Sequence, residues 1–116
     1  MPITTRYLLT VSMDVEPEYE ALFNEVYDTE HVPYLMAVDG VHSVTRAKGE
    51  SFGFAMAGEV KQVDAPTPRY VAHYEIDDPS IVASDAWANA VETGRWSSEV
   101  RPHTFNRSHA MYRICD

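Results

Sequence analysis

Alternating apolar and polar positions predict four strands along the chain. The first is expected at residues 6–13, because large apolar side chains recur at every second position from Tyr7 to Met13. Three further runs are rich in β-branched and aromatic residues, which favour extended structure. These strands are expected at residues 41–47, 69–76 and 109–114.

Apolar positions at helical spacing predict two amphipathic helices between the strands. The first begins at residues 16–18, where a proline lies between two glutamates. Pro33 lacks a backbone N–H and is expected to disturb this helix near Val32. The second helix is expected to begin with Asp78 as its N-cap and to end at Gly94.

Two segments carry weaker patterns. Residues 49–68 are rich in glycine and proline, yet large apolar side chains alternate over residues 52–56. We expect a partial strand extension there, or a loop packed against another element. Residues 95–107 have no clear period and are expected to be held in place by two large apolar anchors, Trp96 and Phe105.

The predicted order β-α-β-β-α-β favours an α+β fold of the ferredoxin-like type, formed by residues 1–116 as one domain. In this arrangement an antiparallel four-stranded sheet carries both helices on one face. In the first and third strands, large apolar or aromatic side chains occupy both odd and even positions, such as Tyr7 beside Leu8 and Val71 near Tyr74, so they point to both faces of the sheet. A sheet that is apolar on both faces needs two covers. A second copy of the chain is the simplest second cover, so we expect a homodimer.

Composition and charge exclude several classes of function. The chain has 116 residues, 45% of them hydrophobic, and 18 acidic against 9 basic residues give a net charge of −9. Nucleic acids and anionic membranes are poor partners for such a chain, since both need a basic face. No apolar run is long enough to span a membrane, and no signal peptide is visible. The lone Cys115 excludes an intrachain disulfide and is compatible with the cytoplasm.

Charge is unevenly distributed along the sequence. Residues 16–30 carry six acidic side chains and no lysine or arginine, whereas residues 95–116 carry four arginines. The pattern fits an acidic, solvated helix face and a basic last segment. It also fits an arginine of the last segment, such as Arg107, that holds an anionic group of a small ligand.

Several segments resemble one protein family. The sequence Tyr-Asp-Thr-Glu-His-Val-Pro at residues 27–33, followed by Asp-Gly-Val at 39–41, is similar to the Tyr-x-x-x-His-x-Pro…Gly segment of EthD-like dimeric α+β barrel proteins. Residues 69–75 resemble their third strand, and residues 101–106 the segment before their last strand. The chain departs from the family pattern at Asp39, where proline is frequent, and at His73, where an aliphatic residue is expected.

The resemblance implies a homodimer whose two sheets face each other, with a pocket in each subunit between sheet and helices. The wider superfamily includes cofactor-free quinone-forming monooxygenases, muconolactone isomerase, polyketide cyclases, dehydratases and haem-degrading enzymes. It therefore constrains the fold more than the reaction.

Histidines are the best candidates for chemistry. His31 lies on the apolar face of the first predicted helix, where it is suited to act as a general acid or base, or else bonds a backbone carbonyl freed by Pro33. His73 lies in the middle of the third strand, either as a second acid or base or as a partner in a cross-strand hydrogen bond. Because strand neighbours point to opposite faces, only one of His73 and Tyr74 can line a given pocket.

Other side chains are candidates for binding. His103 either closes the mouth of the pocket or is an ordinary surface histidine. Three aromatic residues are expected as pocket walls or as ordinary core, namely Tyr34, Trp87 and Trp96. No histidine spacing indicates a metal site, and no glycine-rich phosphate loop is present, so we expect neither metal nor organic cofactor.

Two functions remain open. The first is a small cofactor-free enzyme that carries out proton transfer on an aromatic or polyketide-like substrate, with room for an anionic group. Dehydration, cyclisation, isomerisation or a related lyase step would fit, and cofactor-free oxygenation is a variant. The second is a non-catalytic or stress-associated barrel protein that binds a small apolar ligand. Haem handling is a minor third alternative.

Overall fold

The computed structural model of the chain describes residues 3–115. Within these residues the main elements follow in the order β1 (Tyr7–Val15), α1 (Glu20–Val26), α2 (Val32–Met36), β2 (Val41–Lys48), β3 (Phe52–Met56), β4 (Glu59–Val63), β5 (Tyr70–Ile76), α3 (Asp85–Glu92) and β6 (Thr104–Arg113). Short 3-10 and π-helical turns connect several of them, at Pro17–Tyr19, Tyr27–His31, Pro79–Ala83, Trp96–Val100 and Arg101–His103.

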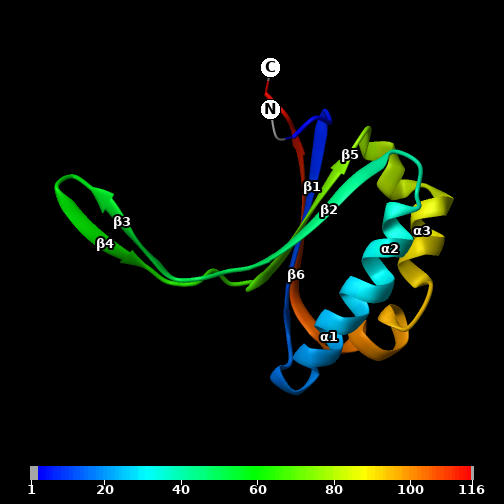
Figure 1. Cartoon of the computed structure of the whole chain (residues 1–116), viewed down its shortest axis with the longest axis horizontal. Helices are drawn as coiled ribbons and strands as arrows, with labels where there is room; N and C mark the ends of the chain where they lie inside the picture. Colours follow the sequence, from blue (N-terminus) through cyan, green and yellow to red (C-terminus); the bar gives the residue numbers. More distant parts are fainter. Residues whose placement is uncertain (1–2, 116) are drawn as a thin grey trace.

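Four of the strands form an antiparallel sheet in the order β2-β5-β1-β6. The helices lie together on one face of this sheet, and the opposite face carries none of them (Figure 1). The predicted α+β class is confirmed, and the arrangement is consistent with a ferredoxin-like fold. The four predicted strands are all present, three of them within two residues of their expected bounds. The last strand, expected at residues 109–114, begins earlier, at Thr104, within the segment that was expected to be irregular.

The first helical segment is continuous in direction but changes its hydrogen-bond pattern in the middle. α1 passes into a π-helical turn at Tyr27–His31, and α2 follows from Val32. Pro33 lies in the first turn of α2, where a missing N–H costs little. The expected disturbance near Val32 is therefore present, as a π-turn ahead of the proline rather than a break.

The second helical segment differs in detail from the prediction. Asp78 caps a turn as expected, since its carboxylate accepts a hydrogen bond from the backbone N–H of Ser80. That turn is a 3-10 turn, however, and Ser84 provides a second cap whose hydroxyl accepts from the N–H of Trp87 at 3.2 Å. α3 then ends at Glu92, and Gly94 follows with a positive φ of 81°.

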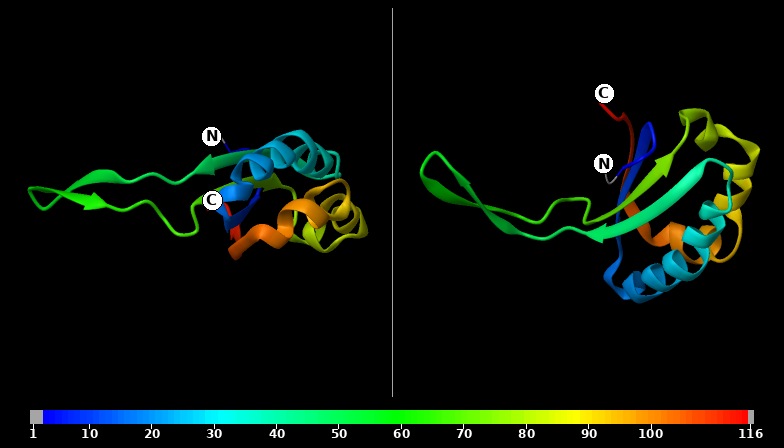
Figure 2. Two further views of the ribbon diagram at one scale, coloured as in Figure 1. Left: turned by 90° about the horizontal axis from the view of Figure 1, so that it is seen from below. Right: turned by 45° about the horizontal axis from the view of Figure 1, so that its top comes forward.

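Residues 49–68 form neither a loop packed on the body nor a simple extension of β2. β3 and β4 pair as a separate two-stranded hairpin, and every residue from 51 to 64 is exposed. The hairpin projects on the side of the sheet opposite the helices (Figures 1 and 2). We call residues 49–68 the arm. The alternation at residues 52–56 was thus a true strand signal, but packing against the body was wrong.

The core lies between the sheet and the helices. Leu9, Val11 and Met13 of β1 point into it, together with Tyr74 and Ile76 of β5. The opposite face is less apolar than expected, because small and polar side chains occupy most of it. That face carries Leu8, Thr10, Ser12, Ser43, Thr45, Val71, His73, Glu75, Ala110 and Tyr112.

Residues 95–103 are ordered by packing, as predicted, but by only one of the two expected anchors. Trp96 is 4% exposed, whereas Phe105 is 47% exposed and was wrongly assigned to the packed interior. A second tie comes from Glu30, whose carboxylate accepts from the backbone N–H of Arg95 at 2.9 Å and from its guanidinium at 2.6 Å. These contacts fix the chain that returns from α3 to β6.

Candidate functional site

A cavity of about 340 Å³ lies between the helix-bearing face of the sheet and the helices. Its volume is in the range of small-molecule sites. The wall is mostly aliphatic and aromatic, and polar groups are few. It is formed by Leu9, Val11, Met13, Tyr27, His31, Leu35, Tyr74, Val82, Trp87, Val91, Trp96, Arg101, Arg107 and His109.

His31 points into this interior, as predicted, and is 5% exposed. Its ring stacks on the indole of Trp96 with centroids 4.3 Å apart and planes 20° from parallel, and the ring of Tyr27 contacts it edge-on at 5.1 Å. Its Nδ1 is buried and has no hydrogen-bond partner among the described residues. The expected backbone acceptor is therefore absent at Nδ1, and aromatic packing holds the ring instead.

Burial also sets the charge of this ring. Loss of hydration and, to a smaller extent, the nearby positive charge of Arg101 lower the pKa of His31, Glu92 opposes the shift, and the resulting pKa is about 4. An imidazole with this pKa is neutral at pH 7. The cavity therefore presents a neutral proton acceptor in an apolar setting.

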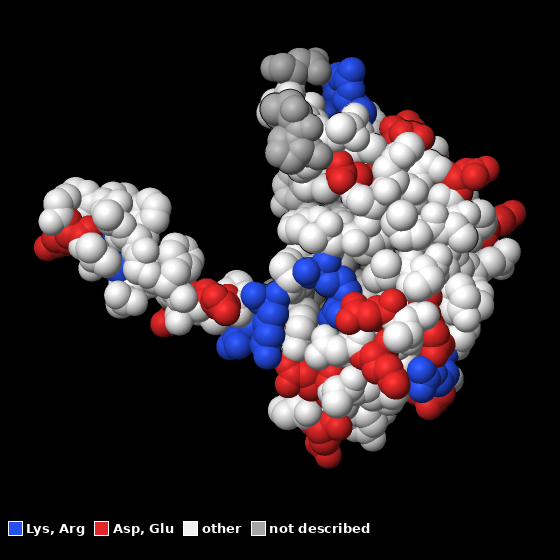
Figure 3. Space-filling model, viewed as in Figure 1, with Lys and Arg blue, Asp and Glu red and all other residues white. Residues whose placement is uncertain are grey.

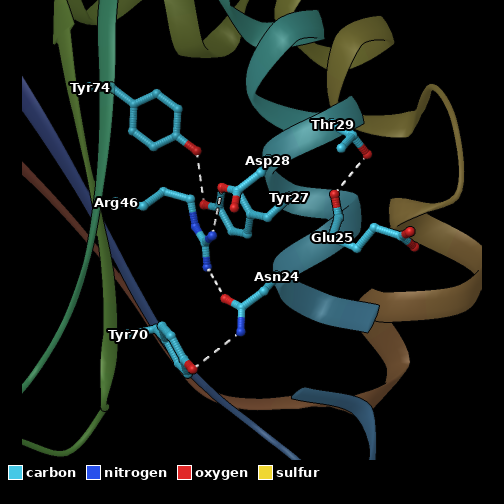
Figure 4. Close-up of polar contacts among 8 residues, drawn as sticks. All are labelled: Asn24, Glu25, Tyr27, Asp28, Thr29, Arg46, Tyr70 and Tyr74. Carbon is cyan, nitrogen blue, oxygen red and sulfur yellow. Dashed lines mark hydrogen bonds and ion pairs between the residues drawn. The ribbon is translucent and has the colours of Figure 1, made fainter. Parts of the chain in front are cut away.

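A pair of phenols forms another part of the wall. The hydroxyl oxygens of Tyr27 and Tyr74 lie 3.0 Å apart in a buried hydrogen bond (Figure 4). Burial raises the pKa of Tyr27 and raises that of Tyr74 well above its usual value. Both phenols are protonated at neutral pH, so Tyr74 is suited to donate a hydrogen bond rather than to act as a base.

Arg46 of β2 holds the Tyr27 ring from the sheet side. Its guanidinium carbon lies 4.4 Å from the centroid of that ring, and its nitrogens donate to Asp28 at 2.7 Å and to Asn24 at 2.8 Å (Figure 4). Tyr70 accepts from the Asn24 amide at 3.4 Å and extends this network along the sheet. The planar guanidinium thus fixes the phenol whose hydroxyl meets Tyr74.

One side of the cavity is positively charged and reaches the surface. Arg107 and His109 of β6 line the cavity and are themselves exposed, so the cavity opens at the β6 edge. Arg101 also lines it and forms a two-point ion pair with Glu92, in which one nitrogen–oxygen distance is 3.1 Å. This side of the cavity is suited to an anionic group of a ligand.

The structure brings five of the eight candidate residues to this cavity. They are His31, Tyr74, Trp87, Trp96 and Arg107. As the strand geometry required, His73 points to the opposite face, where its Nδ1 and the hydroxyl of Thr10 are hydrogen-bonded at 3.1 Å. His73 and His31 therefore belong to different sites.

Two further candidates lie away from the cavity. Tyr34 is 37% exposed on α2 and is not part of the wall. His103 stacks on Tyr19 with ring centroids 3.4 Å apart, and its Nδ1 lies 2.7 Å from a carboxylate oxygen of Glu16. His103 therefore ties surface elements together, and neither residue lines the cavity.

Three residues that bring polar groups to the cavity wall were missed by sequence reasoning. Tyr27 precedes His31 by one helical turn, and that spacing already placed both rings on one face. His109 follows Arg107 at strand spacing and shares its face. Arg101 carried no comparable signal, because its position depends on the turns at Trp96–His103.

The described residues show neither a metal site nor a membrane-spanning helix. Residues 3–115 contain no group of three or more histidine, cysteine, aspartate or glutamate side chains placed to hold a metal ion. No helix in the described part of the chain is long and apolar enough to cross a membrane.

Comparison with known proteins identifies the fold. No family model and no curated protein matches the sequence. Among solved structures, a crystal structure of an ethyl tert-butyl ether D (EthD) family protein from Bacillus halodurans C-125 matches with a TM-score of 0.57. The match covers 94% of this chain and 99% of that protein, at 12% sequence identity. The chain therefore has an EthD-like α+β fold, in agreement with the resemblance seen at residues 27–33.

Proposed function

We propose that the protein is a small cofactor-free enzyme that moves a proton on an aromatic or polyketide-like substrate bound in the 340 Å³ cavity. One observation carries the proposal above all: a neutral, buried histidine and a buried tyrosine hydroxyl line the same apolar cavity. Proton transfer needs only a positioned acceptor and donor in a dry site.

In this proposal His31 is the proton acceptor. Its pKa of about 4 keeps the imidazole unprotonated at neutral pH, so its nitrogen is free to accept a proton, as a weaker base than an ordinary histidine. The same burial makes the protonated ring a stronger acid than an ordinary imidazolium, so it returns the proton readily to another atom of the substrate. Such a cycle matches dehydration, cyclisation or isomerisation, where one proton leaves and one is delivered.

Tyr74 and the arginines supply the complementary charge. Because the Tyr74 phenol stays protonated, it can donate to an oxygen on which negative charge develops when His31 removes a proton. Arg107 at the mouth is placed to hold a carboxylate or phenolate of the substrate. Oxygenation of an electron-rich aromatic would begin with the same deprotonation, so it remains a variant of this proposal.

A second candidate function is ligand binding without catalysis. It is favoured by the largely aliphatic and aromatic wall, which a purely binding protein would also need. Here His31 and Tyr74 would only orient the ligand.

Solvent deuterium exchange separates the two functions. A panel of aryl 1,3-diketones and aryl β-keto acids is incubated with the protein in D₂O, and exchange at the acidic carbon is followed by NMR. The enzyme proposal expects exchange that falls 10²–10⁴-fold in His31→Ala while calorimetry still detects binding. Binding without any acceleration of exchange in the parent protein would support the second candidate and contradict the first.

We also infer that the working form is a homodimer. Support comes from the face of the sheet that carries no helix, where Leu8, Val71 and Tyr112 lie among small side chains. Covering these three apolar side chains with a second copy would remove them from water and favour association. Sedimentation at micromolar concentration should therefore give about twice the 13.1 kDa chain mass. A folded monomer at that concentration would contradict this inference.

A further inference from the structure

The cavity between the sheet and the helices has an enclosed end and an open end. At the enclosed end the hydroxyl of Tyr74 meets that of Tyr27 at 3.0 Å, and the ring of His31 lies 5.1 Å from the Tyr27 ring. Tyr74, Tyr27 and His31 are 1%, 2% and 5% exposed. At the open end Arg107 and His109 line the cavity and are themselves exposed. The groups suited to proton transfer and the groups suited to an anion therefore lie at different ends.

The sheet register gives the separation of the two ends. Tyr74 of β5 pairs with Leu9 of β1, and Leu9 pairs with Met111 of β6. His109 pairs with Val11 and points to the same face as Met111, because two residues separate them. Two strand spacings across the sheet and two residues along it place the backbones of Tyr74 and His109 about 12 Å apart. Side chains stand roughly perpendicular to a sheet, so the polar ends of these two side chains have a similar separation.

An apolar stretch of wall joins the two ends. Leu9, Val11 and Met13 of β1 form its floor and are 5%, 8% and 4% exposed. Trp87 and Val91 of α3 line the same cavity from the helical side. Since the floor offers no polar side chain, a ligand that reaches both ends has to lie across β1 with an apolar middle.

The charge of Arg107 is available to a ligand, unlike that of the arginines near the helices. Arg101 also lines the cavity, but both of its terminal nitrogens bond Glu92. Arg95 is likewise paired with a glutamate, and the basic side chains visible over the helices in Figure 3 lie against acidic ones. The side chains of Arg107 and His109 have no hydrogen-bond or ion-pair partner among residues 3–115. An anionic group of a ligand would be the partner that Arg107 lacks.

We propose that the substrate is an elongated acid bound in one orientation, with its anionic group at Arg107 and its reacting carbonyl at Tyr74. Allowing one hydrogen bond at each end, these two groups of the substrate are about 6–10 Å apart. A simple β-keto acid, whose carboxylate and ketone are one carbon apart, reaches only one end at a time. Two fused rings substituted at opposite ends reach both. The identity of the reacting group rests on the proposed function, whereas the orientation is a matter of binding.

Two isomeric acids test the spacing. 6-Acetyl-2-naphthoate carries its ketone and carboxylate at opposite ends of the rings, whereas 3-acetyl-2-naphthoate carries them side by side. The two have the same formula and charge. Calorimetry at neutral pH should show that the first binds at least about tenfold more tightly, the difference expected for one hydrogen bond to a charged group. Equal affinities, tighter binding of the second isomer, or no binding of either would overturn the proposal.

Ligands that carry only one of the two groups test the orientation. Arg107→Gln should weaken binding of 2-naphthoate about tenfold and leave that of the uncharged 2-acetylnaphthalene unchanged. Tyr74→Phe should do the reverse and weaken 2-acetylnaphthalene several-fold, because only this ligand has a ketone for the phenol. Arg113→Gln is the matched control for the arginine, since Arg113 lies on the same strand but does not line the cavity. If each variant weakened both ligands equally, the orientation would be wrong.

Binding and proton transfer are measured separately. Calorimetry needs no proton transfer, so the spacing can fail while deuterium exchange in the diketone panel persists, and exchange can be absent while the spacing holds. Tyr74→Phe leaves the Tyr27 hydroxyl without its partner, so circular dichroism checks that the variant folds. If it does not fold, the two isomers and Arg107→Gln, at an exposed position, still decide the proposal.

Discussion

The imidazole of His31 lies almost flat against the indole of Trp96, with ring centroids 4.3 Å apart. The two residues come from segments far apart in the sequence, the π-turn after α1 and the π-turn after α3. Their contact replaces hydrogen bonding as the means of fixing the histidine, because Nδ1 has no partner in the described part of the chain. Stacking thus positions the imidazole while its Nδ1 makes no hydrogen bond within the described residues.

The first prediction concerns acid stability. The pKa of His31 is about 4 in the folded protein and near 6.5 when unfolded, so the unfolded chain binds an extra proton between these values. Stability should therefore fall as pH decreases from about 6.5 to 4, by roughly 3 kcal/mol from this residue alone. Urea unfolding of the parent and of His31→Gln across this range should show the loss in the parent only. If the unfolding free energies of the two proteins changed in parallel with pH, the lowered pKa of His31 would be contradicted. Carboxylates also titrate at low pH, but their contribution cancels in the difference between the two proteins.

The second prediction concerns the support of that ring. Trp96→Ala should destabilise the protein by about 3–5 kcal/mol, since it removes a large buried side chain. In Trp96→Phe, which keeps an aromatic ring, the loss should be smaller. In both variants the pKa of His31 should rise towards its ordinary value, because water gains access to the imidazole. NMR titration of the ring protons measures this, and a pKa that stayed near 4 would show that Trp96 is not what excludes water.

The third prediction concerns the phenol pair. Tyr27→Phe or Tyr74→Phe leaves the remaining buried hydroxyl without its 3.0 Å partner and should cost roughly 1–3 kcal/mol each. The double variant should cost less than the sum, because no unpaired hydroxyl is left. A double-mutant cycle by urea denaturation measures the coupling. Simple additivity would mean that the hydrogen bond contributes little.

The fourth prediction concerns ligand charge. Arg107→Gln should weaken binding of 1-naphthoate about tenfold and leave binding of the neutral 1-naphthamide nearly unchanged, provided the arginine pairs with the carboxylate. Arg113→Gln is the matched control, since Arg113 belongs to the same strand but does not line the cavity. Equal losses for both ligands would indicate that Arg107 acts through packing.

The sequence predicted the layout of the sheet and the inward direction of His31, because both depend on local periodicity. Large apolar side chains recur at every second position from Tyr7 to Met13, and residues 27 and 31 share a helical face. Phe105 and the arm were misjudged for a common reason. Both are apolar yet exposed, and a hydrophobic pattern alone does not distinguish a buried side chain from an exposed one.

Tyr34 and Arg101 show a second limit. Tyr34 lies in α2 directly after the π-turn at Tyr27–His31, and Arg101 follows the π-turn at Trp96–Val100. The geometry of such turns is weakly encoded in periodicity. His73 shows the opposite case, in which strand parity alone separated it from Tyr74.

The chain contains two tryptophans, and both Trp87 and Trp96 line the cavity. All of the protein's tryptophan fluorescence therefore comes from the wall of the cavity. A ligand that enters the cavity should change emission directly, without a label. Because Trp96 stacks on His31, and protonated imidazole quenches indole emission, acidification should dim the same signal as the ring takes up its proton. The site thus carries its own optical readout of both occupancy and protonation.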